Sequence, residues 1–396
     1  MGRFKVDNQD YISHDSSEWS LLVMKKMLVI AKSLGGGGSE VALVELLNHL
    51  DPQKFEVTLL LLDHDNEYKY RLKNHIAIKY IDFDNEYYHK LVSMYSFLGK
   101  AVKKIKFNSR VGLYDLVAKH CSKINEHFDI AIDFYGYGAF TTAYLALNVL
   151  ADKKAFWLHD EKMPWLKNTE KYFPNVNKIF CVSKSIKKEF DNLYPNEQNK
   201  SEVFYNVLDT SEIIKKSEKF YPKELDPKNF NIVTVGRLTE QKGYDISIKA
   251  ASLLKQDGIS FKWYGIGEGK DRKKLERLIN KEKLNNNFYL LGRKDNPYPY
   301  IKNCDIYAQP SRHEGYSIAL TEARVLKKLI VTSDFPANKE QIEDSTNGII
   351  SQLNPIDLEE KIKKLYLNSS LKKQILKNLN SEKIDFDEDI KKLDSI

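Results

Sequence analysis

The sequence predicts an α/β protein built from two doubly wound parallel sheets, one in each half of the chain. Short apolar runs of strand length alternate with segments whose apolar residues recur at helical spacing. Helix-length crossovers between strands favour parallel pairing, with helices on both faces of each sheet. The alternation restarts near residue 230, and 396 residues are too many for one ordinary domain. Two similar units are therefore expected.

In the first half, a buried strand is followed by a glycine run and a helix. We predict the strand over Met27–Ala31 and the helix over Glu40–Leu50, whose apolar residues fall on one face. The glycines between them, Gly35–Gly38, form a flexible turn at the start of the helix. The further strands predicted in this half are Val57–Leu62, Ile130–Phe134, Ala155–Leu158 and Lys178–Val182.

The second half repeats this order. A strand over Phe230–Val235 leads through a loop into a helix over Tyr244–Lys255. The later predicted elements are the strand Ser260–Tyr264, the helix Lys270–Lys281 and the strands Phe288–Leu291, Ile306–Gln309 and Leu329–Thr332.

A polar joint with two prolines, residues 206–229, separates the halves. The predicted division is an extension or remnant outside the fold (1–23), an N-terminal domain (24–206), a C-terminal domain (207–380) and a tail (381–396). The tail is charged and weakly helical, and it could pack back on the N-terminal domain.

Composition excludes several protein classes. The chain is 42% hydrophobic and 30% charged, as globular proteins are. No apolar run approaches the ~20 residues of a membrane-spanning helix, and the first residues lack the apolar core of a signal peptide. The three cysteines are widely separated and have no metal-site spacing. A reducing, cytoplasmic location is expected.

One segment is strongly basic. From Lys90 to Arg110 the chain carries six cations and no acid, interleaved with apolar residues, and the net charge of the whole chain is +7. The segment is read as a solvated helix face or as a peripheral contact with anionic lipid headgroups on the inner face of a membrane. No groove-reading motif accompanies the charge, so nucleic acid is not an expected partner.

The most informative stretch runs from His313 to Ala323. Glu314 lies in a glycine-containing loop that opens a predicted helix, and Glu322 lies eight residues further on, inside that helix. A helix start exposes unpaired N–H groups that attract phosphate. A carboxylate would repel phosphate, so both glutamates are expected to meet hydroxyl groups beside it. Phosphate flanked by hydroxyl-bearing groups describes a sugar nucleotide.

Two loops of the same half could face such a ligand. The loop from Gly236 to Gly243 carries Arg237 and Lys242 directly after a strand, where open α/β sheets bind ligands. The loop that begins at Gly265 could let a nucleotide approach the backbone closely, or be a simple tight turn. The loop that begins at Gly265 lacks the spacing of a dinucleotide fingerprint, and the run Gly35–Gly38 lacks the spacing of an NTPase P-loop.

In the first half, His159 and Asp160 end a predicted strand. A histidine at this position points into the crevice and is predicted to contact substrate, although many such histidines are structural. Asp160 could orient His159, face the acceptor or cap the next segment. The acidic run Asp385–Asp389 looks like a metal motif, but it lies in a charged tail and is taken as a solvated run.

Together these residues resemble the retaining family 4 glycosyltransferases, which have the GT-B fold of two Rossmann-like domains facing a central cleft. Glu314 and Glu322 match the EX7E motif of the family, the loop from Gly236 to Gly243 matches its GR…KG loop, and Gly36 with Gly37 matches its N-terminal glycine loop. The resemblance covers residues 24 to about 380. It is closest to bacterial capsule and cell-wall polysaccharide enzymes.

The resemblance implies roles for these residues. Arg237 and Lys242 would bind the donor diphosphate and stabilise the leaving nucleoside diphosphate without a metal or other cofactor. Glu322 would hold the ribose hydroxyls, Glu314 would contact the transferred hexose, and His159 would hydrogen-bond the sugar near the reacting carbon. The backbone near Gly292-Arg293 would meet the base of the nucleotide. The full set of predicted donor-binding residues is Gly36, Gly37, Arg237, Lys242, Gly265, Arg293, Glu314, Gly315, Tyr316, Ser317 and Glu322.

The expected activity is retaining transfer of a hexose or N-acetylhexosamine from a UDP-linked nucleotide sugar to a glycan or lipid-linked glycan in surface polysaccharide synthesis. Tyr316-Ser317 replaces the more frequent Phe-Gly, which bears on the fit of the hexose. Two alternatives stay open. One is a UDP-sugar epimerase of the same fold, and the other is a non-catalytic subunit that binds a sugar nucleotide or a glycan.

Overall fold

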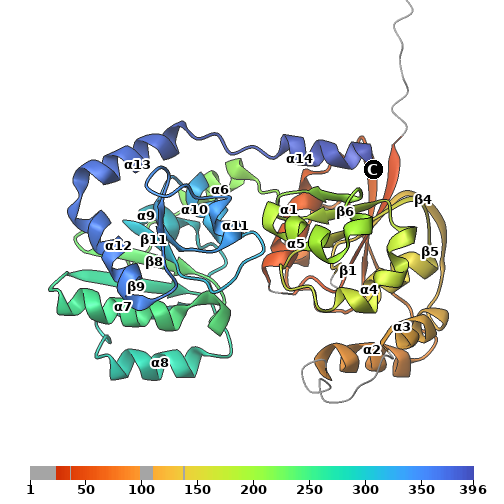
Figure 1. Ribbon diagram of the computed structural model, residues 1–396, viewed down its shortest axis with the longest axis horizontal. Helices are drawn as coiled ribbons and strands as arrows, with labels where there is room; N and C mark the ends of the chain where they lie inside the picture. The colour runs from red at the N-terminus through yellow and green to blue at the C-terminus, as the bar shows by residue number, and fades with distance from the viewer. Residues whose placement is uncertain (1–23, 36, 99–109, 137–138) are drawn as a thin grey trace, which may run out of the picture.

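The computed structural model describes residues 24–396 apart from 36, 99–109 and 137–138, and it has two lobes (Figure 1). A seven-stranded sheet in the order β3-β2-β1-β4-β5-β6-β7 forms the N-terminal lobe, and a six-stranded sheet in the order β10-β9-β8-β11-β12-β13 forms the C-terminal lobe. Every strand pairing within these sheets is parallel. The predicted fold class, two doubly wound parallel sheets, is confirmed.

The N-terminal sheet contains two strands that the sequence did not predict. Its strands are β1 (Lys25–Ala31), β2 (Phe55–Leu61), β3 (Ala77–Tyr80), β4 (Ile124–Asp133), β5 (Val149–Leu158), β6 (Lys178–Cys181) and β7 (Ser201–Val203). The missed strands, β3 and β7, are the two short edge strands. The helices are α1 (Gly38–His49), α2 (Glu86–Leu98), α3 (Arg110–Lys119), α4 (Phe140–Asn148) and α5 (Lys184–Leu193), with short turns η1 (Lys69–Arg71), η3 (Leu166–Asn168), η4 (Glu170–Asn175) and η5 (Pro195–Glu197).

The C-terminal sheet follows the predicted order of strands and adds one short edge strand, β13. Its strands are β8 (Phe230–Val235), β9 (Phe261–Ile266), β10 (Phe288–Gly292), β11 (Ile306–Gln309), β12 (Leu329–Ser333) and β13 (Ile349–Ser351). The helical elements of this part are α6 (Thr210–Ser217), η6 (Glu240–Lys242), α7 (Tyr244–Gln256), α8 (Arg272–Lys281), α9 (Tyr298–Asn303), α10 (Ile318–Val325), α11 (Pro336–Lys339), α12 (Pro355–Leu367), α13 (Ser369–Ser381), α14 (Asp387–Lys391) and η7 (Lys392–Ser395).

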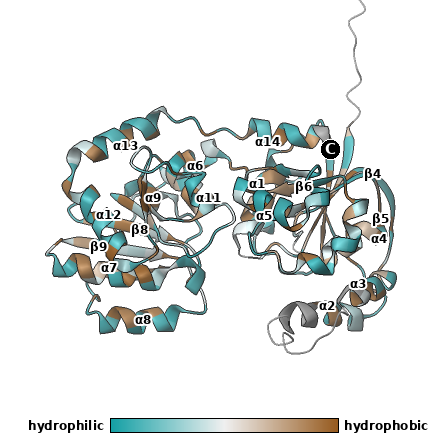
Figure 2. Ribbon diagram, in the orientation of Figure 1, coloured by the Kyte–Doolittle hydropathy of each residue, from teal (hydrophilic) through white to brown (hydrophobic). Residues whose placement is uncertain are grey.

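Each sheet is buried between helices, as doubly wound sheets require. Figure 2 shows the apolar residues gathered along the strands and the polar residues on the outer faces of the helices. Trp157 and Trp263 are fully buried at the centres of the two domains. The indole N–H of Trp263 donates to Thr234 Oγ1 at 3.0 Å, so its one polar atom is satisfied.

The polar joint between the halves contains a helix. Within residues 206–229, α6 is capped by Asp209, whose carboxylate accepts from the Glu212 N–H. The helix packs against α9 and α10 of the C-terminal domain. Sequence reasoning missed α6 because it is only two turns long and lies in a polar segment.

The tail returns to the N-terminal domain. In Figure 1, α14 lies over the lobe formed by the first half of the chain. Asp389 accepts a hydrogen bond from the Tyr205 N–H at 3.2 Å, and Lys392 Nζ donates to the Val203 carbonyl at 2.7 Å. The acidic run at 385–389 therefore includes Asp389, whose carboxylate joins the tail to the N-terminal domain.

The basic segment from Lys90 to Arg110 lies partly outside the described residues, because 99–109 are not described. Lys90 forms an ion pair with Glu86 at 3.1 Å, one turn earlier on α2. The first cation of the segment thus has an acidic neighbour, which favours a solvated helix face at that end. Across the residues that the structure does describe, no helix is long and apolar enough to cross a membrane.

Candidate active site

The two domains present the carboxyl ends of their strands to one another, and nearly all of the predicted site residues lie on the loops after those ends. The N-terminal domain contributes the loops after β1, β4 and β5. The C-terminal domain contributes the loops after β8, β10 and β11. Backbone contact between the domains is very close at Gly315, where a Cβ atom would lie 1.8 Å from the His159 carbonyl oxygen. Only glycine fits there.

Lys242 and Glu314 meet in this crevice, although 72 residues separate them. Lys242 Nζ lies 2.6 Å from Glu314 Oε1, and the side chains are 16% and 8% exposed. Gln309, at the end of β11, donates to the same carboxylate oxygen at 3.2 Å and to Ser317 Oγ at 2.5 Å. Lys242, a cation that could bind phosphate oxygens, therefore lies directly beside Glu314, a carboxylate that could accept from hydroxyl groups.

Two contacts hold the loops of Lys242 and Glu314 together. Gly243 has φ +67°, and a Cβ there would lie 1.9 Å from the Pro310 carbonyl oxygen. Arg312 pairs with both oxygens of Asp245, at 2.8 and 2.7 Å, and its N–H donates to the Gln241 carbonyl at 2.7 Å. Bidentate pairing fixes the orientation of both partners. Sequence reasoning missed Arg312 and Asp245, because only the fold brings them together.

The helix start after Glu314 is α10. Ser317 is its N-cap and accepts from the Leu320 N–H, and Tyr316 and Gly315 precede it. Glu322 lies inside this helix and is 7% exposed. Tyr298 donates to it at 3.1 Å, and burial raises its pKa to about 7. Burial therefore favours the neutral form of Glu322 more than that of an exposed carboxyl group.

His159 follows β5 and packs against the Phe134 ring, with centroids 4.6 Å apart. Its Nε2 lies 2.9 Å from the Phe134 carbonyl oxygen, which can only accept. Burial lowers the pKa of His159 to about 4, so the ring is neutral with its proton on Nε2. The lone pair is then on Nδ1, which suits acceptance from a hydroxyl. Asp160 accepts from the Lys162 N–H at 3.1 Å, as in the capping alternative.

Families of known proteins match both halves of the chain. Residues 215–381 match the family described as Glycosyl transferases group 1, and residues 36–212 match Glycosyltransferase Family 4. An uncharacterized glycosyltransferase of Methanocaldococcus jannaschii is 31% identical over 264 residues, which cover 64% of this chain and 70% of that protein. The chain belongs to glycosyltransferase family 4.

Another relative of this glycosyltransferase is a bacterial N-acetylgalactosaminyltransferase. An enzyme of Campylobacter jejuni named N-acetylgalactosamine-N,N'-diacetylbacillosaminyl-diphospho-undecaprenol 4-alpha-N-acetylgalactosaminyltransferase is 26% identical over 209 residues, covering 50% of this chain and 55% of that enzyme. The chain thus spans about half the length of that relative.

Solved structures share the whole fold at low identity. Anabaena HepE in complex with UDP superposes with a TM-score of 0.71 and 16% identity, covering 93% of this chain and 98% of that one. Staphylococcus aureus TarM superposes with a TM-score of 0.70 and 16% identity, covering 94% and 99%. The family 4 glycosyltransferase therefore has the GT-B fold.

Other predicted residues of the glycosyltransferase are placed differently. Arg237 is exposed on the loop after β8. Gly37 is the extended N-cap of α1, whereas Gly36 lies outside the described residues. Gly265 was expected at the crevice, but it lies inside β9, where a Cβ would be 2.8 Å from the Tyr244 ring. Its absent side chain serves core packing.

Asp133 is a buried carboxylate that sequence reasoning missed. It ends β4, is fully buried, and accepts from Thr142 Oγ1 at 2.5 Å and from the Tyr135 N–H at 3.0 Å. Burial raises its pKa to about 6. The available signal was an acidic residue ending an apolar strand at the edge where ligands bind. Its partners show that it holds the loop after β4 against the start of α4.

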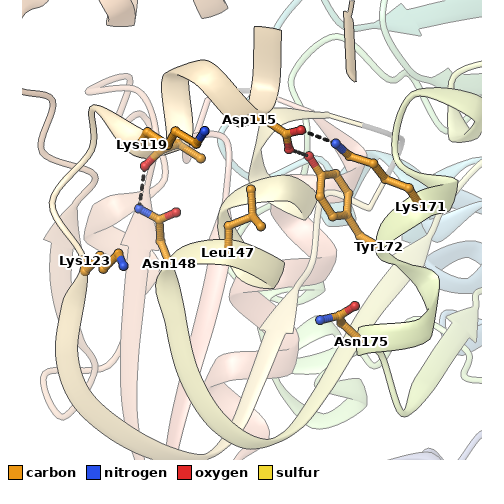
Figure 3. A pocket seen from close by; sticks show the side chains of 9 residues that line it. Asp115, Lys119, Lys123, Leu147, Asn148, Lys171, Tyr172 and Asn175 are labelled. Atoms are coloured by element: carbon orange, nitrogen blue, oxygen red, sulfur yellow. Dashed lines mark hydrogen bonds and ion pairs between the residues drawn. The ribbon is translucent and has the colours of Figure 1, made fainter. Parts of the chain in front are cut away.

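A cavity of about 500 Å³ lies away from the crevice, between α3, α4 and η4 (Figure 3). Asp115 accepts from Lys171 and from the Tyr172 hydroxyl on its wall. Lys119 lies in the last turn of α3, where a cation complements the helix dipole. Lys119 and Lys171 thus have a structural role at this cavity. Among the residues described, no cluster of three or more His, Cys, Asp or Glu side chains is arranged to hold a metal ion.

Proposed function

We propose that this glycosyltransferase moves a hexose or an N-acetylhexosamine from a UDP-linked donor to a glycan or lipid-linked glycan acceptor, with retention at the anomeric carbon. The observation that carries the proposal is the contact of Lys242 with Glu314 beside the start of α10. A donor diphosphate needs positive charge and N–H groups, and the sugar next to it needs hydroxyl acceptors. This corner of the crevice supplies both.

The leaving group would be stabilised by charge. As the bond between the anomeric carbon and the phosphate oxygen breaks, negative charge develops on the diphosphate. Lys242, Arg237 and the N–H groups at the start of α10 would face that charge, and no step of this transfer requires a metal. The acceptor oxygen would attack from the face that the phosphate leaves, and its proton would pass to the leaving phosphate oxygen. Retention of configuration follows.

Glu314 and His159 would position the sugar. Glu314 already has Lys242 and Gln309 as donors, so its carboxylate is fixed in place. His159 is held beside the crevice by the contact of its Nε2 with the Phe134 carbonyl, and could there position a sugar hydroxyl. Neither side chain needs to form a covalent intermediate.

Similar proteins support the proposed donor and acceptor. HepE has been crystallised with UDP and with UDP-glucose, and the Campylobacter enzyme acts on a diphospho-undecaprenol-linked sugar. A lipid-linked acceptor would suit peripheral contact with a membrane surface. Tyr87 on α2 and Leu116 on α3 are 60% and 48% exposed, next to the basic segment.

The test is transfer from a panel of UDP- and GDP-sugars, with and without a lipid-linked acceptor, followed as release of nucleoside diphosphate. We expect acceptor-dependent release of UDP, an α-linked product by NMR from an α-linked donor, and full activity in EDTA. An inverted product would contradict the mechanism. Conversion of the donor sugar without acceptor would instead identify an epimerase, and binding without turnover would identify a non-catalytic subunit.

A further inference from the structure

A short segment of the N-terminal domain, Glu67–Arg71, contacts the C-terminal domain at the end of β10. The Arg293 guanidinium forms an ion pair with the Glu67 carboxylate and lies 5.3 Å from the centroid of the Tyr68 ring. Arg71 lies 5.2 Å from the same centroid. One aromatic ring is thus contacted by cations from both domains, which favours a fixed position for it.

On its own side, this segment is tied to the glycine loop after β1. The Tyr68 N–H donates to the Leu34 carbonyl at 2.9 Å, and the Leu34 N–H donates to the Asp65 carbonyl at 2.8 Å. Movement of Tyr68 therefore moves the loop at the start of α1.

The segment is also tied to the joint between the domains. Arg71 pairs with Glu45 of α1 at 2.9 Å, and both side chains are mostly buried. The other oxygen of Glu45 accepts from the N–H of Asp209, the N-cap of α6, at 3.4 Å.

On the opposite side, Arg293 belongs to the end of the site predicted for the nucleoside. It follows Gly292, which has φ +75° and whose carbonyl accepts from the Gly267 N–H at 2.9 Å. Burial raises the pKa of Glu322, the carboxylate predicted for the ribose, and the charge of Arg71 lowers it. Arg71 of the Glu67–Arg71 segment therefore lies near Glu322.

We propose that Glu67, Tyr68 and Arg293 form a clamp that closes the nucleoside end of the donor site, so that the N-terminal domain helps to hold a nucleoside diphosphate. The inference rests on the proposed function. The clamp residues are positioning residues, because they join the domains at one end of the crevice while Lys242 and Glu314 act at the other. Their loss should weaken nucleotide binding and leave turnover of bound donor nearly intact.

The expected effect is moderate. The Glu67 and Arg293 side chains are 40% and 37% exposed, so water and salt screen their attraction. A partly exposed ion pair together with one cation–aromatic contact corresponds to roughly a fivefold change in affinity. The effect should shrink as salt rises.

The experiment measures UDP binding to the full chain by calorimetry, together with KM for the UDP-sugar and kcat. We expect Glu67→Gln to raise Kd for UDP and KM about fivefold, Glu67→Lys to raise them further through repulsion of Arg293, and kcat to change less than twofold. Tyr68→Leu should act like Glu67→Gln, whereas Tyr68→Phe keeps the ring and should bind normally. Glu218→Gln is the matched control, since Glu218 pairs with Lys302 on a similarly exposed surface without crossing the crevice.

Failure of the clamp can be told from failure of the proposed function. If the wild type binds UDP and Glu67→Lys and Tyr68→Leu bind it with the same affinity, the clamp is wrong and the proposed donor class is unaffected. No binding of UDP by the wild-type chain would overturn the donor class and the clamp together. Glu67 is on the surface, so its variants keep the test valid even where Tyr68→Leu fails to fold.

Discussion

At the scale of single residues, the site contains charged groups that are held in unusual environments. Burial raises the pKa of Glu322 to about 7 and of Asp133 to about 6, and it lowers that of His159 to about 4. The two raised carboxyl pKa values make the unfolding free energy fall as pH rises from the ordinary carboxyl range to 6–7. The lowered histidine pKa makes it fall as pH drops below about 6.5. These opposed terms flatten the pH dependence of stability.

Lys242→Ala and Glu314→Gln should each lower kcat/KM for sugar transfer about 100- to 1,000-fold, because each removes a charged group at the diphosphate or the sugar. Circular dichroism and thermal unfolding should show that both variants fold. Lys249→Ala, which removes an exposed lysine of α7, is the control and should be fully active. Near-normal transfer by Lys242→Ala would contradict the assignment of the diphosphate site.

Donor affinity should depend on pH through Glu322. Two ribose hydroxyls donate best to the ionised carboxylate, and burial raises the pKa of Glu322 to about 7. Kd for a UDP-sugar should therefore rise roughly tenfold as pH falls from 8 to 6. Glu322→Gln should bind more weakly and show a flat profile over this range. A wild-type profile that stays flat would argue against ribose binding by Glu322.

At the scale of elements, the interior strands and the long helices follow from periodicity, and the edges do not. β11 begins and ends where the sequence predicts, since three apolar residues and Gln309 are bounded by Asp305 and Pro310. β5 begins six residues earlier than predicted. Its first half is partly exposed and carries the charged residues Asp152, Lys153 and Lys154. Exposed strand ends lack the apolar pattern on which prediction depends.

The turn at Gly243 offers a matched pair of glycine substitutions. Gly243 and Gly258 have φ +67° and +74°, but a Cβ at 243 would strike the Pro310 carbonyl while a Cβ at 258 meets open space. Gly258→Ala should cost about 1 kcal/mol of unfolding free energy from backbone strain alone. Gly243→Ala should cost more and should lower transfer activity, because it displaces Lys242 from Glu314. Equal losses of stability and activity in the two variants would show that strain, and not collision, dominates.

At the scale of the whole molecule, the two domains are held in register by contacts outside the site. The Glu340 carboxylate accepts from the N–H groups of Lys184 and Ser185, both at 2.8 Å, and so caps α5 of the other domain. A carboxylate at a helix start gains from the unpaired N–H groups and from the helix dipole. This cap and the returning α14 join the lobes on the side away from the clamp segment.

Glu340→Ala should loosen the joint between the domains. Loss of two charge-assisted hydrogen bonds at a helix start should cost about 1–2 kcal/mol. Scanning calorimetry should show a lower first transition and a wider separation between the unfolding of the two domains. Glu343→Ala, which removes an exposed glutamate three residues away, is the control and should unfold like the wild type. A single, unchanged transition in Glu340→Ala would show that other contacts couple the domains.

The sequence by itself determined the two doubly wound sheets and the residues after their strands, because helical and strand periodicity and loop chemistry are local properties of the chain. It placed Lys242, Glu314 and Glu322 on loops and a helix of one half without any knowledge of packing. Only the tertiary structure decided that Gly315 touches His159, that Arg293 pairs with Glu67, and that Glu322 is buried enough to change its pKa. Such contacts depend on how the two domains are placed relative to each other, and no local sequence pattern determines that placement.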